Sequence, residues 1–130
     1  MTSIKEMPYE NNISGDIVSI RDTLESELIK VSRKLEDKNK PFFLVVLDDN
    51  NKIKGVITRD ELREMLNEAK KGSDFKIEFE DYAKKHVVFE ENEDAIKGLK
   101  ELKKVENKGF VLIKNKEGNY VGKILLADLI

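Results

Sequence analysis

The sequence predicts an α/β protein in which two similar β-α-β-β-α units follow one another. The first observation is the length of 130 residues, which suits one ordinary domain or two very small ones. The second is the composition: 39% of the residues are hydrophobic and 38% are charged, which is typical of a compact folded chain. The third is an internal repeat, because residues 20–62 align with residues 87–129 without a gap.

The repeat rests on identical residues that are mostly apolar or glycine, as expected if both copies keep one backbone. Outside these positions the apolar pattern of the two copies also agrees. The identical pairs are Ile29/Ile96, Lys30/Lys97, Leu35/Leu102, Phe43/Phe110, Gly55/Gly122, Ile57/Ile124 and Leu62/Leu129. The alignment therefore indicates an internal duplication.

The first copy begins with a short strand at residues 18–20. Apolar residues then recur at spacings of four, three and four, which predicts an amphipathic helix; they are Leu24, Leu28, Val31 and Leu35. Residues 42–47 form an apolar run that is too short for a helix and suits a strand buried on both faces. A polar turn at residues 48–52 leads into another strand from Ile53, so we expect an antiparallel hairpin.

A second helix closes the first copy, and its apolar face consists of Leu62, Met65, Leu66 and Ala69. The second copy repeats the same order. It has strands at residues 87–89, at 110–113 and from Asn119, and a helix with Gly98 inside it and an apolar face of Ile96, Leu99 and Leu102. The sequence stops where the last helix of this copy begins. We therefore expect that helix to be truncated, or the chain to be a fragment of a longer protein.

These elements divide the chain into an N-terminal extension at residues 1–12, a first repeat at 13–71, a linker at 72–75 and a second repeat at 76–130. A unit of about 60 residues buries too little surface to be comfortably stable alone. We expect the two repeats to share one hydrophobic core.

The composition excludes several classes of function. The chain has no cysteine and one histidine, which excludes disulfide scaffolds, thiolate nucleophiles and multi-histidine metal sites. The formal net charge is −2 and basic residues are interspersed with acidic ones, which does not favour a nucleic-acid binder. No apolar run is long enough for a membrane span, and no secretory signal is evident, so we expect a cytoplasmic protein.

Residues 55–62, Gly-Val-Ile-Thr-Arg-Asp-Glu-Leu, resemble the pattern that closes a CBS (cystathionine-β-synthase-type) motif. That pattern is a glycine, two apolar residues, a serine or threonine, two variable positions, an acid and an apolar residue. Residues 122–129 match it less completely. Residues 15–18, and more loosely 80–83, resemble the short segment that stands directly before each CBS strand in the family. The resemblance covers roughly residues 13–130.

This resemblance implies a CBS domain pair, or Bateman module, with two β-α-β-β-α units about a pseudo-twofold axis and two clefts between them. In that family the clefts commonly bind adenosyl ligands such as AMP, ADP, ATP or S-adenosylmethionine. Binding regulates an attached or associated enzyme or transporter, and the modules usually form dimers. The resemblance thus implies a regulatory homodimer without enzymatic activity, with no catalytic residue, no metal and no required cofactor.

The ligand site that the resemblance implies includes Gly55, Ile57, Thr58, Arg59 and Glu61 in the first copy and Gly122 and Asp128 in the second. Thr58 would hold a phosphate beside the free N–H groups of a helix start. Glu61 stands where the family has aspartate and would accept hydrogen bonds from the ribose hydroxyls. Arg59 could reach a phosphate, or it could be an ordinary surface residue.

Two alternatives remain open for these residues. Thr58 and Glu61 at a helix start also fit a capping box, which needs no ligand. In the second copy Leu125 replaces the hydroxyl residue, although Asp128 keeps the acid. The chain could therefore be an adenosyl-ligand sensor with one competent site, or a ligand-free module that only dimerises or docks to a partner. An enzyme is disfavoured because no nucleophile, acid and base set is present.

Overall fold

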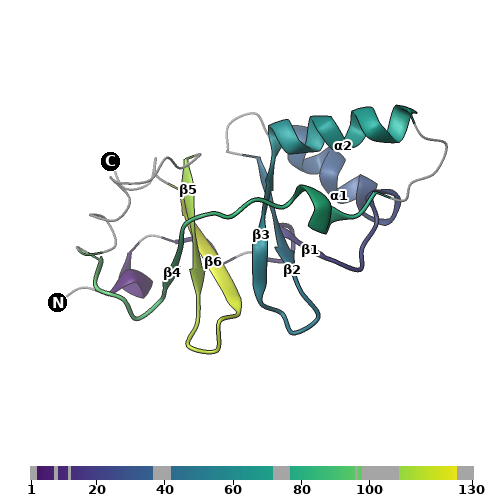
Figure 1. Cartoon of the computed structure of the whole chain (residues 1–130). Coiled ribbons are helices and arrows are strands. Elements are labelled where there is room, and N and C mark those ends of the chain that lie inside the picture. The colour runs from purple at the N-terminus through teal and green to yellow at the C-terminus, as the bar shows by residue number, and fades with distance from the viewer. Residues whose placement is uncertain are drawn as a thin grey trace. The chain divides into compact units, whose positions relative to one another are not determined.

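The computed structural model describes residues 3–7, 9–11, 13–36, 42–71, 77–95, 97 and 109–125. The chain divides into two compact units (Figure 1). The central unit is Ser14–Lys85, and the terminal unit combines Met1–Ile13 with His86–Ile130. Each is described by itself below.

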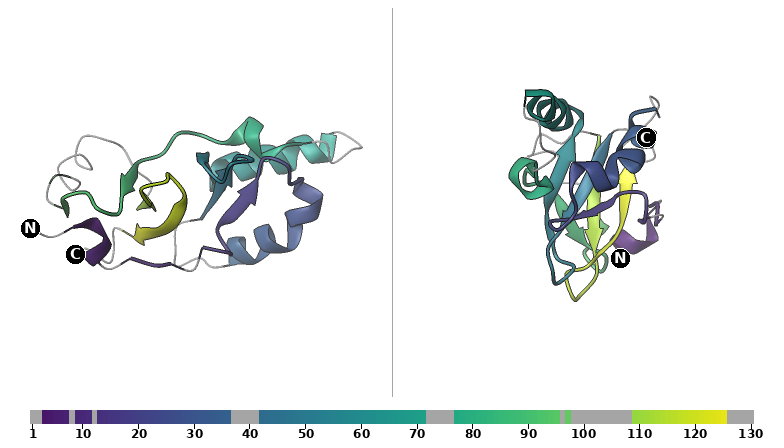
Figure 2. Two further views of the ribbon diagram at one scale, coloured as in Figure 1. Left: turned by 90° about the horizontal axis from the view of Figure 1, so that it is seen from below. Right: turned by 90° about the vertical axis from the view of Figure 1, so that its right-hand side faces the viewer.

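The central unit contains the predicted β-α-β-β-α order. Its elements are β1 (Ile17–Ser19), α1 (Leu24–Glu36), β2 (Phe43–Leu47), β3 (Ile53–Thr58), α2 (Arg59–Lys71) and the short 3-10 helix η2 (Phe79–Tyr82). The sheet has the order β1-β2-β3; β1 runs parallel to β2, and β2 and β3 form the predicted antiparallel hairpin. The two views of Figure 2 show η2, in green, beside α2, which it contacts.

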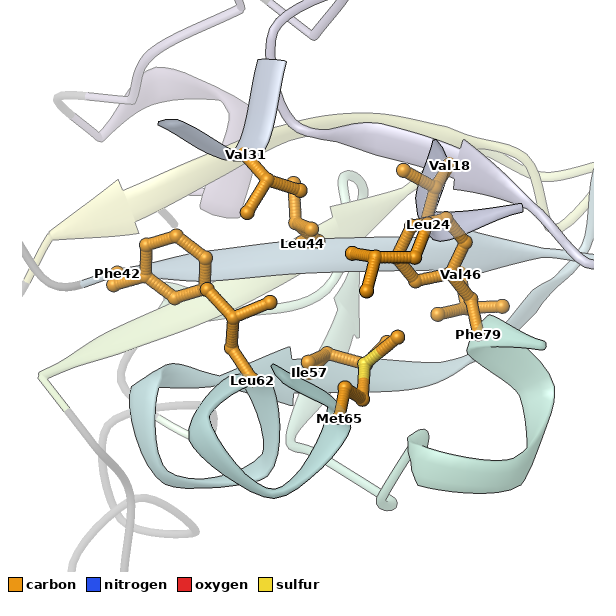
Figure 3. Close-up of a cluster of buried hydrophobic side chains, with 10 residues drawn as sticks. All are labelled: Val18, Leu24, Val31, Phe42, Leu44, Val46, Ile57, Leu62, Met65 and Phe79. Carbon is orange, nitrogen blue, oxygen red and sulfur yellow. The ribbon is translucent and has the colours of Figure 1, made fainter. Parts of the chain in front are cut away.

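One face of this sheet forms the core of the central unit with both helices (Figure 3). Alternate residues of β2 point to this face, as the twofold repeat of a strand requires. The cluster consists of Val18, Leu24, Val31, Phe42, Leu44, Val46, Ile57, Leu62, Met65 and Phe79. The intervening β2 residues Phe43 and Val45 are buried as well, which confirms the prediction of a strand buried on both faces.

The predicted apolar face of α1 is wrong at one position. Leu24 and Val31 are buried and Leu35 packs against the core, but the Leu28 side chain is 41% exposed. At about 100° per residue, Leu28 stands roughly 60° around the helix axis from Val31, at the margin of the buried face. Regular spacing alone does not show how wide that face is.

The terminal unit has a second sheet of the same design. It contains η1 (Ile4–Glu6), β4 (Val88–Glu90), β5 (Phe110–Lys114) and β6 (Tyr120–Leu125), and its sheet has the order β4-β5-β6. Its core cluster contains Ile4, Phe89, Ala95, Val111, Ile113 and Ile124. The predicted helix face of Ile96, Leu99 and Leu102, with Gly98, and the predicted site residue Asp128 lie outside the described residues.

The two sheets agree in the details of their pairing. Each joins a parallel pair to an antiparallel hairpin. Each hairpin also has one register irregularity, between Val46 and Leu47 in one sheet and between Ile113 and Lys114 in the other. These positions correspond in the sequence alignment of the repeats, as expected if the two sheets share one ancestral backbone.

Two segments, each of which precedes the first strand of its own repeat, pack on the sheet of the other repeat. The inner lead-in, residues 77–85, belongs to the central unit, and the outer lead-in, residues 3–7 and 9–11, belongs to the terminal unit. Lys84 and Val56 exchange two backbone hydrogen bonds of 2.8 Å. Glu10 and Lys123 do the same at 2.8 and 2.9 Å. Each lead-in thus forms an antiparallel bridge with the last strand of a sheet.

Gly55 and Gly122 make room for these bridges. A Cβ atom on Gly55 would lie 2.7 Å from the carbonyl oxygen of Lys84. On Gly122 it would lie 2.5 Å from the carbonyl oxygen of Glu10 and 2.8 Å from the ring of Tyr9. Such distances are too short for carbon and oxygen, so both positions need glycine for space.

We expect Gly55→Ala and Gly122→Ala each to lower the free energy of unfolding by about 1–3 kcal/mol, because overpacking forces the lead-in away from its strand. Urea denaturation of the full chain measures this. Gly15→Ala is the matched control, since a Cβ there meets no atom within 4 Å. Equal stability of Gly55→Ala and Gly15→Ala would contradict the assignment.

Candidate functional site

The predicted site residues of the first copy lie where β3 runs directly into α2. Thr58 is the last residue of β3, and Arg59 is the first of α2. The first turn of a helix has backbone N–H groups without helical partners and carries partial positive charge. This junction therefore offers an environment that favours negative charge.

Gly55 and Ile57 are placed differently from the residues of the helix start. Gly55 is covered by the backbone of Lys84, so its closest neighbour in the structure is the inner lead-in. The Ile57 side chain is fully buried in the core cluster, and its Cα is paired with that of Leu44 in the sheet. In the described part of the chain, the contacts of Gly55 and Ile57 are therefore packing contacts, and their role in a ligand site stays a prediction.

Thr58, Glu61 and Lys84 form one interacting group. The hydroxyl of Thr58 donates a hydrogen bond to Oε2 of Glu61. Nζ of Lys84 lies 3.3 Å from Oε1 of the same carboxylate. Thr58 is buried, and Glu61 is only 2% exposed. This bond differs from that of a capping box, in which the threonine hydroxyl would accept a backbone N–H.

The surroundings of Glu61 keep its carboxylate ionised. Burial by itself would raise the pKa of Glu61. Hydrogen bonds from the Thr58 hydroxyl, the residue's own backbone N–H and Lys84 oppose this effect, and the positive charge of Lys84 adds to them. Together they lower the pKa below its ordinary value of 4.5. The site thus contains a buried negative charge balanced by one lysine.

Sequence analysis did not single out Lys84 among the interspersed basic residues. A buried acid requires a charged or hydrogen-bonding partner, and that requirement was the available signal. The sequence could not show which of its many lysines meets it, because Lys84 reaches Glu61 through the exchange of the lead-ins.

Arg59 points its guanidinium over an aromatic ring. Its Cζ atom lies 5.6 Å from the centroid of Phe42, within the range of a cation–π contact. The residue is half-buried at the start of α2. The contact holds the guanidinium beside the helix start without an acidic partner among the described residues, where it could meet an anion.

The corresponding place in the terminal unit lacks these groups. Leu125, buried at the end of β6, stands where the first copy has Thr58. Gly122 is covered by Tyr9 and Glu10. Nζ of Lys123, which is itself buried, lies 3.5 Å from a carboxylate oxygen of Glu10. The described part of this copy therefore offers no hydroxyl donor at that position.

Two other polar residues take part in local structure. His86 places Nε2 2.8 Å from the carbonyl oxygen of Phe110 and stacks on its ring with centroids 4.2 Å apart. The carboxylate of Asp48 accepts hydrogen bonds from the N–H groups of Asn50 and Lys52, which closes the predicted polar turn. These bonds lower the pKa of Asp48.

The described ranges contain no group of three or more histidine, aspartate or glutamate side chains arranged to hold a metal ion. No helix among them combines the length and apolar character of a membrane span.

We expect Glu61→Gln to lower the free energy of unfolding by roughly 1–3 kcal/mol at pH 7, because charge-assisted hydrogen bonds are lost. Since the folded pKa of Glu61 is lowered, its contribution is complete above the ordinary value of 4.5 and disappears as the pH falls through the folded pKa. Denaturation at several pH values should show that the free energies of unfolding of the wild type and of Glu61→Gln converge in acid. The control is Glu64→Gln, whose glutamate is exposed; a pH-independent difference for Glu61→Gln would contradict the pairing.

Comparison with known proteins gives one family match and several similar folds. Residues 13–68 match the family model described as CBS domain. A search of curated proteins found no match. Three similar solved structures are a CBS domain pair/ACT domain protein from Thermotoga maritima, CBSX2 in complex with AMP, and the CBS domain of a bacterial CNNM/CorC family Mg²⁺ transporter in complex with an inhibitor.

The structural similarity extends over nearly the whole chain. Sequence identities to these three are 12%, 16% and 20%, and TM-scores are 0.68, 0.67 and 0.69. The alignments cover 98%, 99% and 98% of this chain and 92%, 93% and 73% of the others. The chain spans 57% of a further protein, from Methanocaldococcus jannaschii, with 15% identity and a TM-score of 0.70. Residues 13–68 therefore match the CBS domain family, and the chain has the fold of a CBS domain pair.

Proposed function

We propose that the chain is a regulatory module that binds an adenosyl ligand, AMP, ADP, ATP or S-adenosylmethionine, at the start of α2. The observation that carries the proposal is the hydroxyl–carboxylate pair of Thr58 and Glu61 in the first turn of that helix. A carboxylate can accept hydrogen bonds from both hydroxyls of a ribose. The free N–H groups of the helix start, with Arg59 beside them, suit a phosphate.

The family comparisons support this proposal. CBSX2 was solved in complex with AMP, and another similar structure is the CBS domain of a Mg²⁺ transporter. By analogy, the regulated partner of this chain would be an enzyme or a transporter, and the module would act in the cytoplasm as a homodimer. Binding would change the packing of that dimer. The module would carry out no reaction itself.

A second candidate function is a structural module that binds no small molecule. The specific observation in its favour is that both oxygens of the Glu61 carboxylate already have partners, Thr58 and Lys84. In the second copy, Leu125 in place of a hydroxyl residue also favours a module that binds no ligand. Such a module would dimerise or dock to a partner independently of nucleotides.

Calorimetry and thermal denaturation with adenosine, AMP, ADP, ATP and S-adenosylmethionine distinguish the two functions. A genuine ligand at 100 times its dissociation constant should stabilise the fold by about 2.7 kcal/mol. The sensor predicts this effect for at least one compound of the panel. Flat titrations for every compound, together with a dimer whose mass and stability ignore nucleotides, would favour the structural module.

Thr58→Ala tests the site residue directly. We expect the variant to bind the ligand roughly threefold to tenfold more weakly, as for one lost hydrogen bond, and to lose about 1 kcal/mol of stability. Thr58→Ser keeps the hydroxyl and should restore most of both. Under the structural alternative, the alanine variant changes stability alone.

Arg59→Gln separates phosphate binding from adenosine binding. We expect AMP affinity to fall by about tenfold or more, because a charge-assisted hydrogen bond is lost, while adenosine affinity stays unchanged. Titration calorimetry with both compounds measures this. Arg63→Gln, an exposed arginine one turn later in α2, is the control. Equal AMP affinity in wild type and Arg59→Gln would remove Arg59 from the site.

A further inference from the structure

Lys84 connects the candidate site to the inner lead-in by two kinds of interaction. Its backbone exchanges two hydrogen bonds of 2.8 Å with Val56, and its carbonyl oxygen occupies the space left by Gly55. Its side chain extends to Glu61 in the first turn of α2. One residue therefore fastens the inner lead-in both to the last strand of the sheet and to the acid of the site.

Both oxygens of the Glu61 carboxylate have a partner in this arrangement. Lys84 pairs with Oε1, and Thr58 donates to Oε2. A ribose presents two adjacent hydroxyls, and binding both of them requires both carboxylate oxygens. Each oxygen can accept a second hydrogen bond, but the Glu61 side chain is only 2% exposed, so a ligand that binds both oxygens must move a partner aside to reach them.

The exposure of its two partners indicates which of them can leave the Glu61 carboxylate at a low cost in free energy. The Lys84 side chain is 67% exposed, so its ammonium group can exchange Glu61 for water without entering an apolar environment. The corresponding lysine of the other lead-in contact, Lys123, is only 9% exposed beside Glu10, and its release would leave a buried charge. The Lys84–Glu61 ion pair should therefore break more easily than the Lys123–Glu10 ion pair.

We propose that the Lys84–Glu61 ion pair is the regulatory contact of the site: it fastens the inner lead-in to α2, and an adenosyl ligand that binds Glu61 releases it. This inference rests on the proposed function for its ligand. Because binding and release are linked, the ligand weakens the contact by the same factor by which the contact weakens ligand binding. The inner lead-in continues into β4, so the signal passes along the chain from the site to the next unit.

The first experiment needs no ligand. Amide hydrogen exchange is followed at Val56 and Lys84, whose N–H groups form the bridge. In the full chain, Lys84→Met should speed exchange at both amides by about threefold to tenfold, as for one lost charge-assisted contact. Lys85→Met, a neighbouring exposed lysine, is the matched control and should change neither.

The same spectra contain an internal reference. The amides of Glu10 and Lys123 form the equivalent bridge of the terminal unit, and Lys84→Met should leave their exchange unchanged. Acceleration at both bridges would indicate general destabilisation and overturn the proposal. Unchanged exchange at Val56 in Lys84→Met would overturn it as well, because the side chain would then not fasten the segment.

The second experiment uses adenosine, which carries the ribose hydroxyls without a phosphate. Saturating adenosine should raise exchange at Val56 and residue 84 of the wild-type bridge towards the rate in Lys84→Met. Adenosine should also bind Lys84→Met about threefold to tenfold more tightly than wild type or Lys85→Met. Equal affinity for all three proteins would overturn the competition while leaving the proposed function intact.

Failure of the proposed function gives a different result. If adenosine and AMP bind neither the wild type nor Lys84→Met, which leaves the carboxylate without its lysine, the module binds no adenosyl ligand at Glu61. That outcome overturns the proposed function and the regulatory role together. The exchange measurements would then show whether the ion pair is a purely structural fastening.

Discussion

The fold depends on the antiparallel bridge between each lead-in and the last strand of a sheet. In the described part of the chain each sheet has three strands, and the last strand of each has an edge that is available for main-chain pairing. The lead-in fills that edge and also supplies a core residue, Phe79 in the central unit and Ile4 in the terminal unit. Gly55 and Gly122 are the steric condition for this docking. The glycine of the sequence motif therefore has a structural role, which is to leave space for the lead-in backbone.

The bridge also determines the chemistry of the site. It brings Lys84 beside Glu61, and a carboxylate that is 2% exposed needs such a partner to remain ionised. Glu61, where the family pattern has aspartate, interacts with both Thr58 and Lys84. The contact with Lys84 links the site to a segment from the other repeat. A site with aspartate and no lysine would lack this link.

Sequence reasoning predicted the strands and helices of the central unit because apolar periodicity reports burial directly. It also singled out Gly55, Thr58, Arg59 and Glu61, since their spacing forms a motif, and their role in a ligand site stays a prediction. It overestimated the buried face of α1 at Leu28, because periodicity does not measure how far a sheet extends. It could not predict the exchange of the lead-ins. Main-chain hydrogen bonds such as those of Lys84 and Glu10 carry no side-chain signal, and aligning repeats does not show which sheet each segment joins.

The exchange imposes an order on folding during synthesis. The central unit can close once residue 85 has left the ribosome, because its lead-in follows its sheet. The outer lead-in is made first, but its partner strand β6 is completed only at Leu125. Ile4 therefore cannot complete its core until β6 has been translated. Long-range pairing of this kind is slow, and it leaves the apolar surface of the terminal unit exposed for longer than that of the central unit.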